Sequence, residues 1–477
     1  MHDKIHHFIC EEMFERMNQG KEVYVHIDNL DIIYADSSED DRFSLEFSNE
    51  IGKPVYYLHC SLVSREMLEY DRMMFGYMRE HPNEKEIIYK PYFSEFIIPV
   101  DKNGRVRGKD IGNLFADGIE DTWYTAKLSP NGPCNEFSYV QGDVLTFASP
   151  GKMIHNTLEL KRITDPTEIS NIENTYHSIK TCNEDDIKYL LSKYASDIKK
   201  ANVYNVGHAN FITLNDSNDK TKIIYDIGVP NNSLDQAEKN YNEAFKTMQS
   251  ITTKMVIISH WDSDHYLGAY SNKKNIFNVP WVVSECNKNG QISAKRIANY
   301  LDCKKKLFMV KKATRRQKPN TPPPFAGYNS GTIDFQLYKG YGTAKPITNI
   351  NCQGIAVRIE INCVATLMCG DVPYNCLSDS IINNNEYEYV VIPHHASNMS
   401  DKSYNALNSI KKIKYPIICV NGTEELGKSK INVENGNHCS NIGSKSNQIL
   451  YFTDDDTHAK VNAYICDLTG NNPIDQK

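Results

Sequence analysis

The sequence predicts an α/β protein in which a layered sandwich follows an N-terminal α+β region. Three observations predict this class. Before residue 160, turn signals such as Asp101-Lys-Asn-Gly104 separate strand-like runs around one helical stretch. After residue 200, short buried strands alternate with amphipathic helices, as in α/β layers. A helical connector lies between them. We therefore expect an α+β domain over 1–160, a connector over 161–200 and an α/β domain over 201–477.

The first segment carries strand signals but no motif that assigns a role. Its β-branched and aromatic runs are Val23–Ile27, Val55–His59, Glu95–Pro99 and Asp143–Phe147. Helical spacing predicts a helix near Arg65–Arg79 and another at the N-terminus, around Phe8 and Met13. His2, His6 and His7 could form a metal cluster, but solvated positions on the N-terminal helix account for them better.

The connector contains two helix starts. Asp165-Pro166-Thr167-Glu168 combines an N-cap residue, a proline at the first helical position and an acidic residue three places after the cap. A second helix is expected to begin at Asn183, with an apolar stripe that includes Ile187 and Leu191.

Composition narrows the function classes. The chain has 477 residues and a net charge of −7, which argues against a protein that coats nucleic acid through overall positive charge. No apolar run approaches the length of a membrane span and no secretory signal is recognisable, so we expect no membrane association. Thirteen cysteines without any Cys-x-x-Cys pair favour reduced thiols in a cytoplasm over a disulfide framework.

The most informative stretch is Met255–Gly268. A short apolar strand, Met255–Ile258, is followed by four potential metal ligands within six residues: His260, Asp262, Asp264 and His265. Alternation along an extended segment lets His260 and Asp262 face one point while Trp261 points away, and a turn after Ser263 brings the next two ligands nearby. Two cations about 3.5–4 Å apart could be held here. The extra carboxylate, Asp262, favours a harder cation.

Two later segments repeat this design of a strand followed by ligands. Val364–Cys369 runs into Gly370-Asp371, where a carboxylate at a strand end could bridge two cations. Glu388–Ile392 runs into Pro393-His394-His395-Ala396-Ser397. Further on, Asn437-His438-Cys-Ser440 offers one more histidine.

The pattern His-x-Asp-x-Asp-His resembles the metallo-β-lactamase superfamily signature His-x-His-x-Asp-His, with Asp262 in place of the second histidine. Five ordered motifs over residues 200–466 are similar to the competence-type branch, the hydrolase domains of bacterial DNA-uptake channel proteins. These five accompany the metal loop: the Val-Gly turn before Asn210, Asp226-Ile-Gly228, Gly370-Asp371, the Pro-His-His segment and the segment at His438. The resemblance implies a four-layer αββα sandwich.

The resemblance also implies roles. His260, Asp262 and Asp371 would hold one metal, while Asp264, His265, His394 and Asp371 would hold a second. The absence of any histidine between His265 and His394 matches the competence-type branch. Asp226 would support the metal loop from outside. One or two divalent ions are expected, Zn²⁺ or Mn²⁺, with Mg²⁺ or Fe²⁺ as alternatives.

The resulting hypothesis is a metal-dependent hydrolase, a phosphodiesterase or nuclease that uses a metal-bound hydroxide on nucleic acid or a nucleotide. Asp264 would orient the hydroxide and His395 or His438 would act as acid. Asn210, Ser397 and His208 would contact substrate, although packing explains His208 equally well, and His438 could instead complete a metal shell or pack in a loop.

Three alternatives remain open. The chain could be a metallo-β-lactamase-fold binding or sensor protein with weak or no activity, in which Asp262 marks a decayed site. It could be a bacterial defence or signalling effector whose N-terminal domain gates the hydrolase or binds a protein partner. A basic run from Lys304 to Lys318 is either a solvated loop or a phosphate-binding flap.

Overall fold

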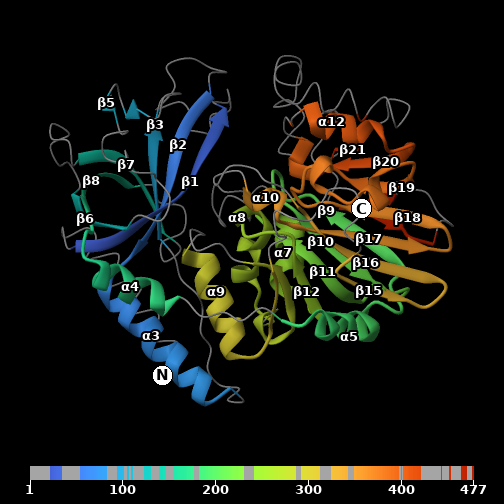
Figure 1. Cartoon of the computed structure of the whole chain (residues 1–477), viewed down its shortest axis with the longest axis horizontal. Helices are drawn as coiled ribbons and strands as arrows, with labels where there is room; N and C mark the ends of the chain where they lie inside the picture. Colours follow the sequence, from blue (N-terminus) through green and yellow to red (C-terminus); the bar gives the residue numbers. More distant parts are fainter. Residues whose placement is uncertain are drawn as a thin grey trace. The chain divides into compact units, whose positions relative to one another are not determined.

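The computed structural model describes residues 22–34, 54–82, 94–100, 105–106, 109–110, 123–129, 139–146, 154–176, 182–229, 241–274, 276–285, 292–311, 324–341, 349–396, 399, 401–419, 442, 451–452, 463–469 and 475–476. The chain divides into two compact units (Figure 1). Unit 1 consists of Met1–Ile179 and Asn287–Lys304, and unit 2 of Lys180–Cys286 and Lys305–Lys477. The predicted N-terminal helix and the basic run beyond Lys311 lie outside the described residues.

Unit 1 is built on six strands that close into a barrel in the order β1-β2-β3-β7-β8-β6. They are β1 Glu22–Tyr34, β2 Pro54–Val63, β3 Ser94–Val100, β6 Trp123–Ser129, β7 Tyr139–Thr146 and β8 Ile154–Arg162. A two-stranded ribbon pairs β4 Arg105–Val106 with β5 Lys109–Asp110. All neighbouring pairs of the barrel are antiparallel. The four runs predicted as strands lie in β1, β2, β3 and β7 and are confirmed, apart from Phe147, which lies outside the described residues.

The helices of unit 1 are α3 Arg65–Glu80, α4 Pro166–Thr175 and α9 Ile292–Cys303. Ser64 caps α3 by accepting a hydrogen bond from the Met67 amide at 3.1 Å, and Asp165 caps α4 with proline at the first helical position. The predicted helix near Arg65–Arg79 and both predicted helix starts in the connector are confirmed, since Asn183 likewise caps the helix α5, Glu184–Tyr194.

Helix α9 belongs to unit 1 although its flanking strands belong to unit 2. Its Arg296 donates to both carboxylate oxygens of Asp71 on α3, at 2.6 and 3.1 Å, and Tyr176 donates to the same carboxylate at 2.9 Å. All three side chains are buried, so the pair is held in a low-dielectric interior with its hydrogen bonds made. The domain limits 1–160, 161–200 and 201–477 remain sequence predictions beside this division.

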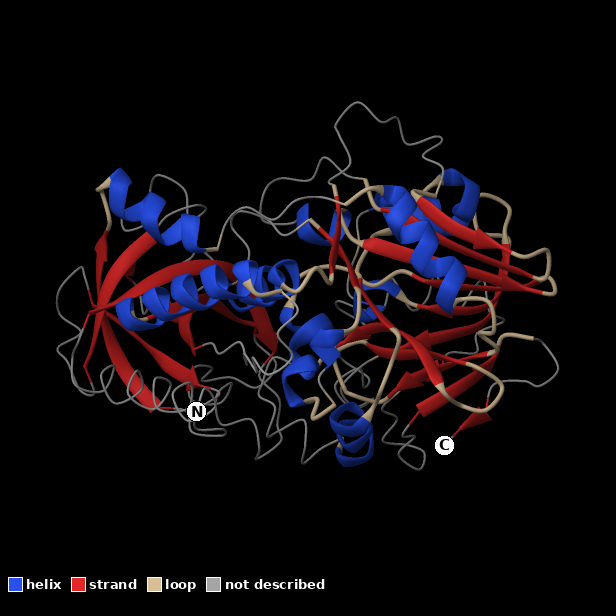
Figure 2. Ribbon diagram, turned by 90° about the horizontal axis from the view of Figure 1, so that it is seen from below, coloured by secondary structure: helices blue, strands red, loops and turns tan. Residues whose placement is uncertain are grey.

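Unit 2 contains two large sheets, seen as separate layers in Figure 2. The eight-stranded sheet has the order β14-β13-β12-β11-β10-β9-β22-β23. Its strands are β9 Lys200–Tyr204, β10 Phe211–Asn215, β11 Thr221–Ile227, β12 Met255–Ile258, β13 Trp281–Ser284, β14 Leu307–Val310, β22 Ala463–Asp467 and β23 Asp475–Gln476.

The seven-stranded sheet has the order β15-β16-β17-β18-β19-β20-β21. Its strands are β15 Ala326–Asn329, β16 Ile333–Lys339, β17 Ile355–Ile361, β18 Val364–Met368, β19 Glu386–Val391, β20 Lys412–Ile418 and β21 Tyr451–Phe452. The helical segments of unit 2 are α5 Glu184–Tyr194, α7 Asn242–Ser250, α8 Ser263–Tyr266, α10 Asn349–Cys352, α11 Asp379–Ile382 and α12 Asp401–Asn408, with 3₁₀ turns at η2 Leu267–Ser271, η3 Ile276–Asn278, η5 Tyr374–Cys376 and η6 Pro393–Ala396.

The two sheets pack face to face and helices cover their outer sides. One apolar core joins the sheets and includes Ile257 from one and Val357 from the other. A second core packs α11 and α12 against the outer face of the seven-stranded sheet. On the outer side of the eight-stranded sheet, Met248 of α7 packs against Gly268, which lies close to the main chain of β11. A Cβ atom on Gly268 would lie 2.4 Å from the Met248 sulfur. The predicted αββα sandwich is confirmed.

Each sheet combines an antiparallel half with a parallel half. Strands β11 to β14 run parallel, as do β18 to β21. The carboxyl ends of parallel strands are the usual place for a ligand site in α/β proteins, because loops diverge there. Strands β12, β18 and β19 all end in the polar segments singled out from the sequence. Among the described residues, no helix has the length and apolar character needed to cross a membrane.

Candidate metal centre

The loop after β12 presents its four ligand-type side chains by way of a short helix. His260 and His265 are fully buried, and Asp262 stands at the N-cap position of α8 with extended backbone. Asp262 makes no capping hydrogen bond, so its carboxylate is available to His260, whose Nε2 lies 3.1 Å from Asp262 Oδ2. Asp264 and His265 belong to the single turn of α8. The first two ligand-type residues therefore precede this turn, and the second two lie on it.

The seven-stranded sheet supplies the other half of the centre. Asp371 follows β18 after Gly370, and its side chain is 3% exposed. After β19 the backbone turns through three successive left-handed residues, His394, His395 and Ala396, with φ of 53°, 51° and 61°. For residues with a side chain this conformation costs about 1–2 kcal/mol each, so the surrounding structure must hold the turn in place.

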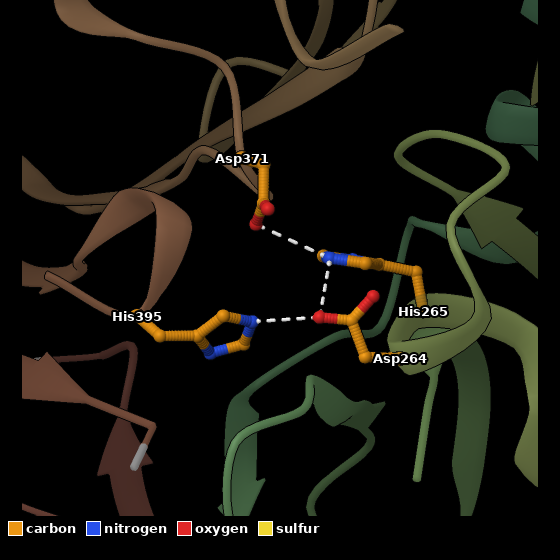
Figure 3. A group of neighbouring side chains, drawn as sticks. All are labelled: Asp264, His265, Asp371 and His395. Atoms are coloured by element: carbon orange, nitrogen blue, oxygen red, sulfur yellow. Dashed lines mark hydrogen bonds and ion pairs between the residues drawn. The ribbon is translucent and has the colours of Figure 1, made fainter. Parts of the chain in front are cut away.

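Four of these side chains form one compact group, shown in Figure 3: Asp264, His265, Asp371 and His395. One ligand atom from each lies within 4.8 Å of the others. His395 Nε2 is 3.1 Å from Asp264 Oδ2, and His265 Nε2 is 3.2 Å from Asp371 Oδ1 and 3.7 Å from Asp264 Oδ2. The side chains follow β12 of one sheet and β18 and β19 of the other, so the group lies at the carboxyl ends of parallel strands from both sheets.

A second cluster shares Asp371. Its Oδ2 lies 2.6 Å from His394 Nδ1 and 3.9 Å from His260 Nε2, which in turn contacts Asp262. Asp371 therefore directs one oxygen into each cluster, in the arrangement by which a carboxylate can bridge two cations. His394 is the open member, because its side chain is 39% exposed.

The structure places His395 in the group of four where the resemblance predicted His394. His395 Nδ1 lies 2.9 Å from the Cys419 carbonyl, which can only accept, so Nδ1 carries the proton and Nε2 faces Asp264. His394 instead contacts Asp371 and the Asn351 side-chain amide, at 3.2 Å. The left-handed turn decides which of the two adjacent rings points inward.

Asp226 supports the metal loop from beneath. Its Oδ2 accepts hydrogen bonds from His265 Nδ1 at 2.8 Å and Ser259 Oγ at 2.9 Å, and its Oδ1 accepts from the Ser259 amide at 2.7 Å. Asp226 is fully buried and has a φ of 56°. A carboxylate behind a ligand histidine fixes the tautomer and orients the ring.

The predicted substrate residues have different surroundings. The Asn210 side chain is 1% exposed, and its backbone amide donates to the Asp264 carbonyl at 3.1 Å, so it braces the metal loop. His208 is exposed, and its ring centroid lies 4.2 Å from that of His395. Ser397 and His438 lie outside the described residues.

Opposite charges in the cluster shift its pKa values strongly. Burial by itself would raise the pKa of Asp264, but His265 and His395 bring it well below its usual range. Burial would likewise raise the pKa of Asp371, which His265 and His394 hold far below normal. Against the opposing effect of burial, Asp264 and Asp371 raise the pKa of His265 well above its usual value. These directions favour an ionised Asp264 and an ionised Asp371 beside a protonated His265.

Two buried atoms test whether a cation fits. His265 Nε2 and Asp371 Oδ1 are shielded from solvent, and neither makes a properly directed hydrogen bond although they lie 3.2 Å apart. Unsatisfied buried polar atoms are costly, and a cation between such lone pairs would satisfy both. Imidazole and carboxylate ligands suit Zn²⁺ and Mn²⁺. The donor set therefore fits a divalent metal.

Sequence reasoning missed Ser259 and Asn351. Ser259 directly precedes the first ligand histidine, and Asn351 lies on the four-residue helix α10, far from any motif. Adjacency to His260 was the available signal for Ser259, whereas no local pattern marks Asn351.

No protein-family model matches this chain, and no curated protein sequence matches it. Several solved structures are similar to part of it. Zn²⁺-bound PqqB from Methylobacterium extorquens is 7% identical with a TM-score of 0.32, covering 54% of this chain and 98% of its own. Yeast PDE1 is 10% identical with a TM-score of 0.28, covering 54% and 97%. The short form of human tRNase Z is 7% identical with a TM-score of 0.26, covering 56% and 99%. Because these scores lie below 0.5, the layered fold rests on the chain's own sheet order and cores.

Proposed function

We propose that this chain is a metal-dependent hydrolase that cleaves phosphodiesters in nucleic acid or a nucleotide, with its centre in unit 2. The observation that carries the proposal is the buried group Asp264, His265, Asp371 and His395, in which two lone-pair atoms have no properly directed hydrogen bond. Structural ion pairs rarely leave such atoms unsatisfied, whereas a cation site requires them. The phosphodiester substrate is supported by the resemblance of five ordered motifs to the competence-type hydrolases.

One cation would be held by Asp264, His265, Asp371 and His395. A second would be held by His260, Asp262 and Asp371. Bound divalent cations polarise a phosphoryl oxygen and make water a nucleophile at neutral pH. Zn²⁺ or Mn²⁺ fits the mixed imidazole and carboxylate donors. Asp262 Oδ2 lies 3.1 Å from His260 Nε2, close enough for the two atoms to share one cation, which favours a working site over a decayed one.

The chain's own groups would position the reaction. The Asp264 carboxylate would orient the attacking water, and its lowered pKa keeps it ionised for that role. His394 would assist the leaving oxygen, because 39% of its side chain is exposed. Its partial burial lowers its pKa, but the Asp371 carboxylate outweighs this and raises the pKa to about 8. His395 would serve as a ligand, since its Nδ1–H is held by the Cys419 carbonyl. Compared with the sequence-based hypothesis, the two histidines exchange roles.

The test is hydrolysis of bis(p-nitrophenyl) phosphate with Zn²⁺ or Mn²⁺, together with elemental analysis of the purified protein. Asp371→Asn should abolish turnover and lower metal content, because one carboxylate serves both clusters. Asp334→Asn, near the start of β16, is the matched control: Asp334 accepts from Gln336 and pairs with Arg358 at 3.5 Å, and the variant should show wild-type turnover and metal content. Equal turnover and metal content in Asp371→Asn and wild type would refute the proposal.

The exchange of histidine roles has its own test. His395→Ala should lose metal and activity together, whereas His394→Ala should retain metal and lose turnover. The opposite pattern would restore His394 as the ligand. A cytoplasmic location and a protein partner of the N-terminal domain stay predictions from the sequence.

A further inference from the structure

Ser259 occupies a central place among the charged groups beneath the candidate metal centre. It is fully buried, and its hydroxyl oxygen has three polar neighbours. Asp226 Oδ2 lies at 2.9 Å, His260 Nδ1 at 3.1 Å and His265 Nδ1 at 3.1 Å. One hydroxyl therefore touches both histidines of the metal loop and the carboxylate behind them.

The direction of each hydrogen bond follows from the number of protons available. An ionised carboxylate only accepts, so the single hydroxyl proton of Ser259 is donated to Asp226, in the stronger, charge-assisted bond. His265 Nδ1 has the same carboxylate as its acceptor, at 2.8 Å. Ser259 Oγ then has only lone pairs left for His260. His260 must therefore carry its proton on Nδ1 and donate it to Ser259.

This assignment determines what His260 presents to the centre. With the proton on Nδ1, the Nε2 lone pair faces Asp262 Oδ2 at 3.1 Å and Asp371 Oδ2 at 3.9 Å. Three electron-pair donors then converge on one point, as a cation requires. With the other tautomer, Nε2 would point a proton at that place.

The backbone on the opposite sheet keeps Ser259 in position. A Cβ atom on Gly370 would lie 2.4 Å from Ser259 Cβ and 2.5 Å from its Oγ. Gly370 also adopts a φ of 55°, which favours glycine. Gly370, the residue before Asp371, thus leaves the space that the Ser259 side chain occupies.

We propose that Ser259 is a positioning residue. It donates a hydrogen bond to Asp226 and accepts one from His260 Nδ1, and it thereby holds the His260 Nε2 lone pair toward the metal. His265 has Asp226 as its own acceptor, so the two histidines should differ in their dependence on Ser259. The proposal rests on the metal centre proposed above and adds a residue that touches neither metal nor substrate.

The test uses the full-length protein labelled with ¹⁵N-histidine and loaded with Zn²⁺. In wild type, His260 and His265 should each show an Nδ1–H proton protected from exchange and an Nε2 shift typical of coordination. A His260 Nε2–H signal in that spectrum would overturn the assignment without any variant.

Ser259→Ala should remove the protected His260 Nδ1–H signal and leave that of His265. Zn²⁺ affinity, measured by chelator competition, should fall about 10–100-fold, as for other partners that hold ligand histidines. Ser284→Ala is the control: it removes another buried serine hydroxyl but retains the carbonyl to which Trp261 donates, and it should leave both readouts unchanged. Unchanged His260 signal and affinity in Ser259→Ala would refute the role of Ser259. Absence of Zn²⁺ binding by wild type would instead refute the metal centre itself.

Discussion

Replacing Gly370 by alanine isolates the packing between Ser259 and the turn that carries Asp371. The new methyl group would meet Ser259 Cβ at 2.4 Å and the Tyr225 hydroxyl at 3.1 Å. Ser259 cannot move aside cheaply, because its amide and hydroxyl are both bonded to Asp226. Overpacking of this kind costs about 1–3 kcal/mol. The left-handed backbone at Gly370 adds about 1–2 kcal/mol for any residue with a side chain.

Gly331 provides a control for the backbone contribution alone. It also has a positive φ, of 86°, but a Cβ atom there would meet nothing within 4 Å. Part of the strain is offset by about 0.4–1 kcal/mol, because alanine restricts the unfolded chain. We therefore expect a loss of about 1 kcal/mol for Gly331→Ala and about 2–4 kcal/mol for Gly370→Ala by combining these contributions.

The assay is urea unfolding followed by tryptophan fluorescence in a Trp123→Phe background. The chain has three tryptophans, and the remaining two, Trp261 and Trp281, both belong to unit 2. Gly370→Ala should also bind Zn²⁺ more weakly than Gly331→Ala, because the displaced Ser259 no longer holds His260. Equal stability of the two variants would refute the claim that Ser259 fills the space left at Gly370.

Two further predictions concern protons and buried charge. Zn²⁺ affinity should rise as the pH is raised from 6, because binding must displace a proton from His265, whose pKa is raised well above its usual value; a flat profile between pH 6 and 9 would contradict the assigned charges. Asp71→Asn should destabilise unit 1 by about 3–5 kcal/mol, because it breaks the buried ion pair in which Arg296 donates to both Asp71 oxygens. Fluorescence of Trp123 in unfolding experiments checks this value, and a loss below about 1 kcal/mol would show that the pair is dispensable.

Local patterns in the sequence were sufficient to find the segments that meet at the centre. Strand β12 and the polar residues after it follow from an apolar run and dense polar spacing, whereas the place of Asp226 behind the loop was implied by the family resemblance. The inward ring of the His394-His395 pair could not be predicted, because the left-handed turn is imposed by packing around it.

Long-range pairing limited prediction in unit 1 for a related reason. The closure of β6 onto β1 and β8 depends on contacts between strands that no local pattern connects. The apolar periodicity of Ile292–Cys303 is typical of the helix found there, α9, but Asp71, the partner of its Arg296, is 225 residues away along the chain. Periodicity identifies a buried face and does not identify which unit buries it.

The place of α9 has a practical consequence for dissecting the molecule. The polypeptide passes from one unit to the other three times, after Ile179, Cys286 and Lys304. A fragment beginning near residue 160 would keep α9 while discarding Asp71, so Arg296 and the apolar side of that helix would be stranded. A difference in activity between such a fragment and the intact chain could therefore reflect misfolding of the fragment, and it would not test whether the N-terminal domain gates the hydrolase. A fragment that contains unit 2 alone requires removal of both pieces of unit 1, with a short linker joining β13 to β14.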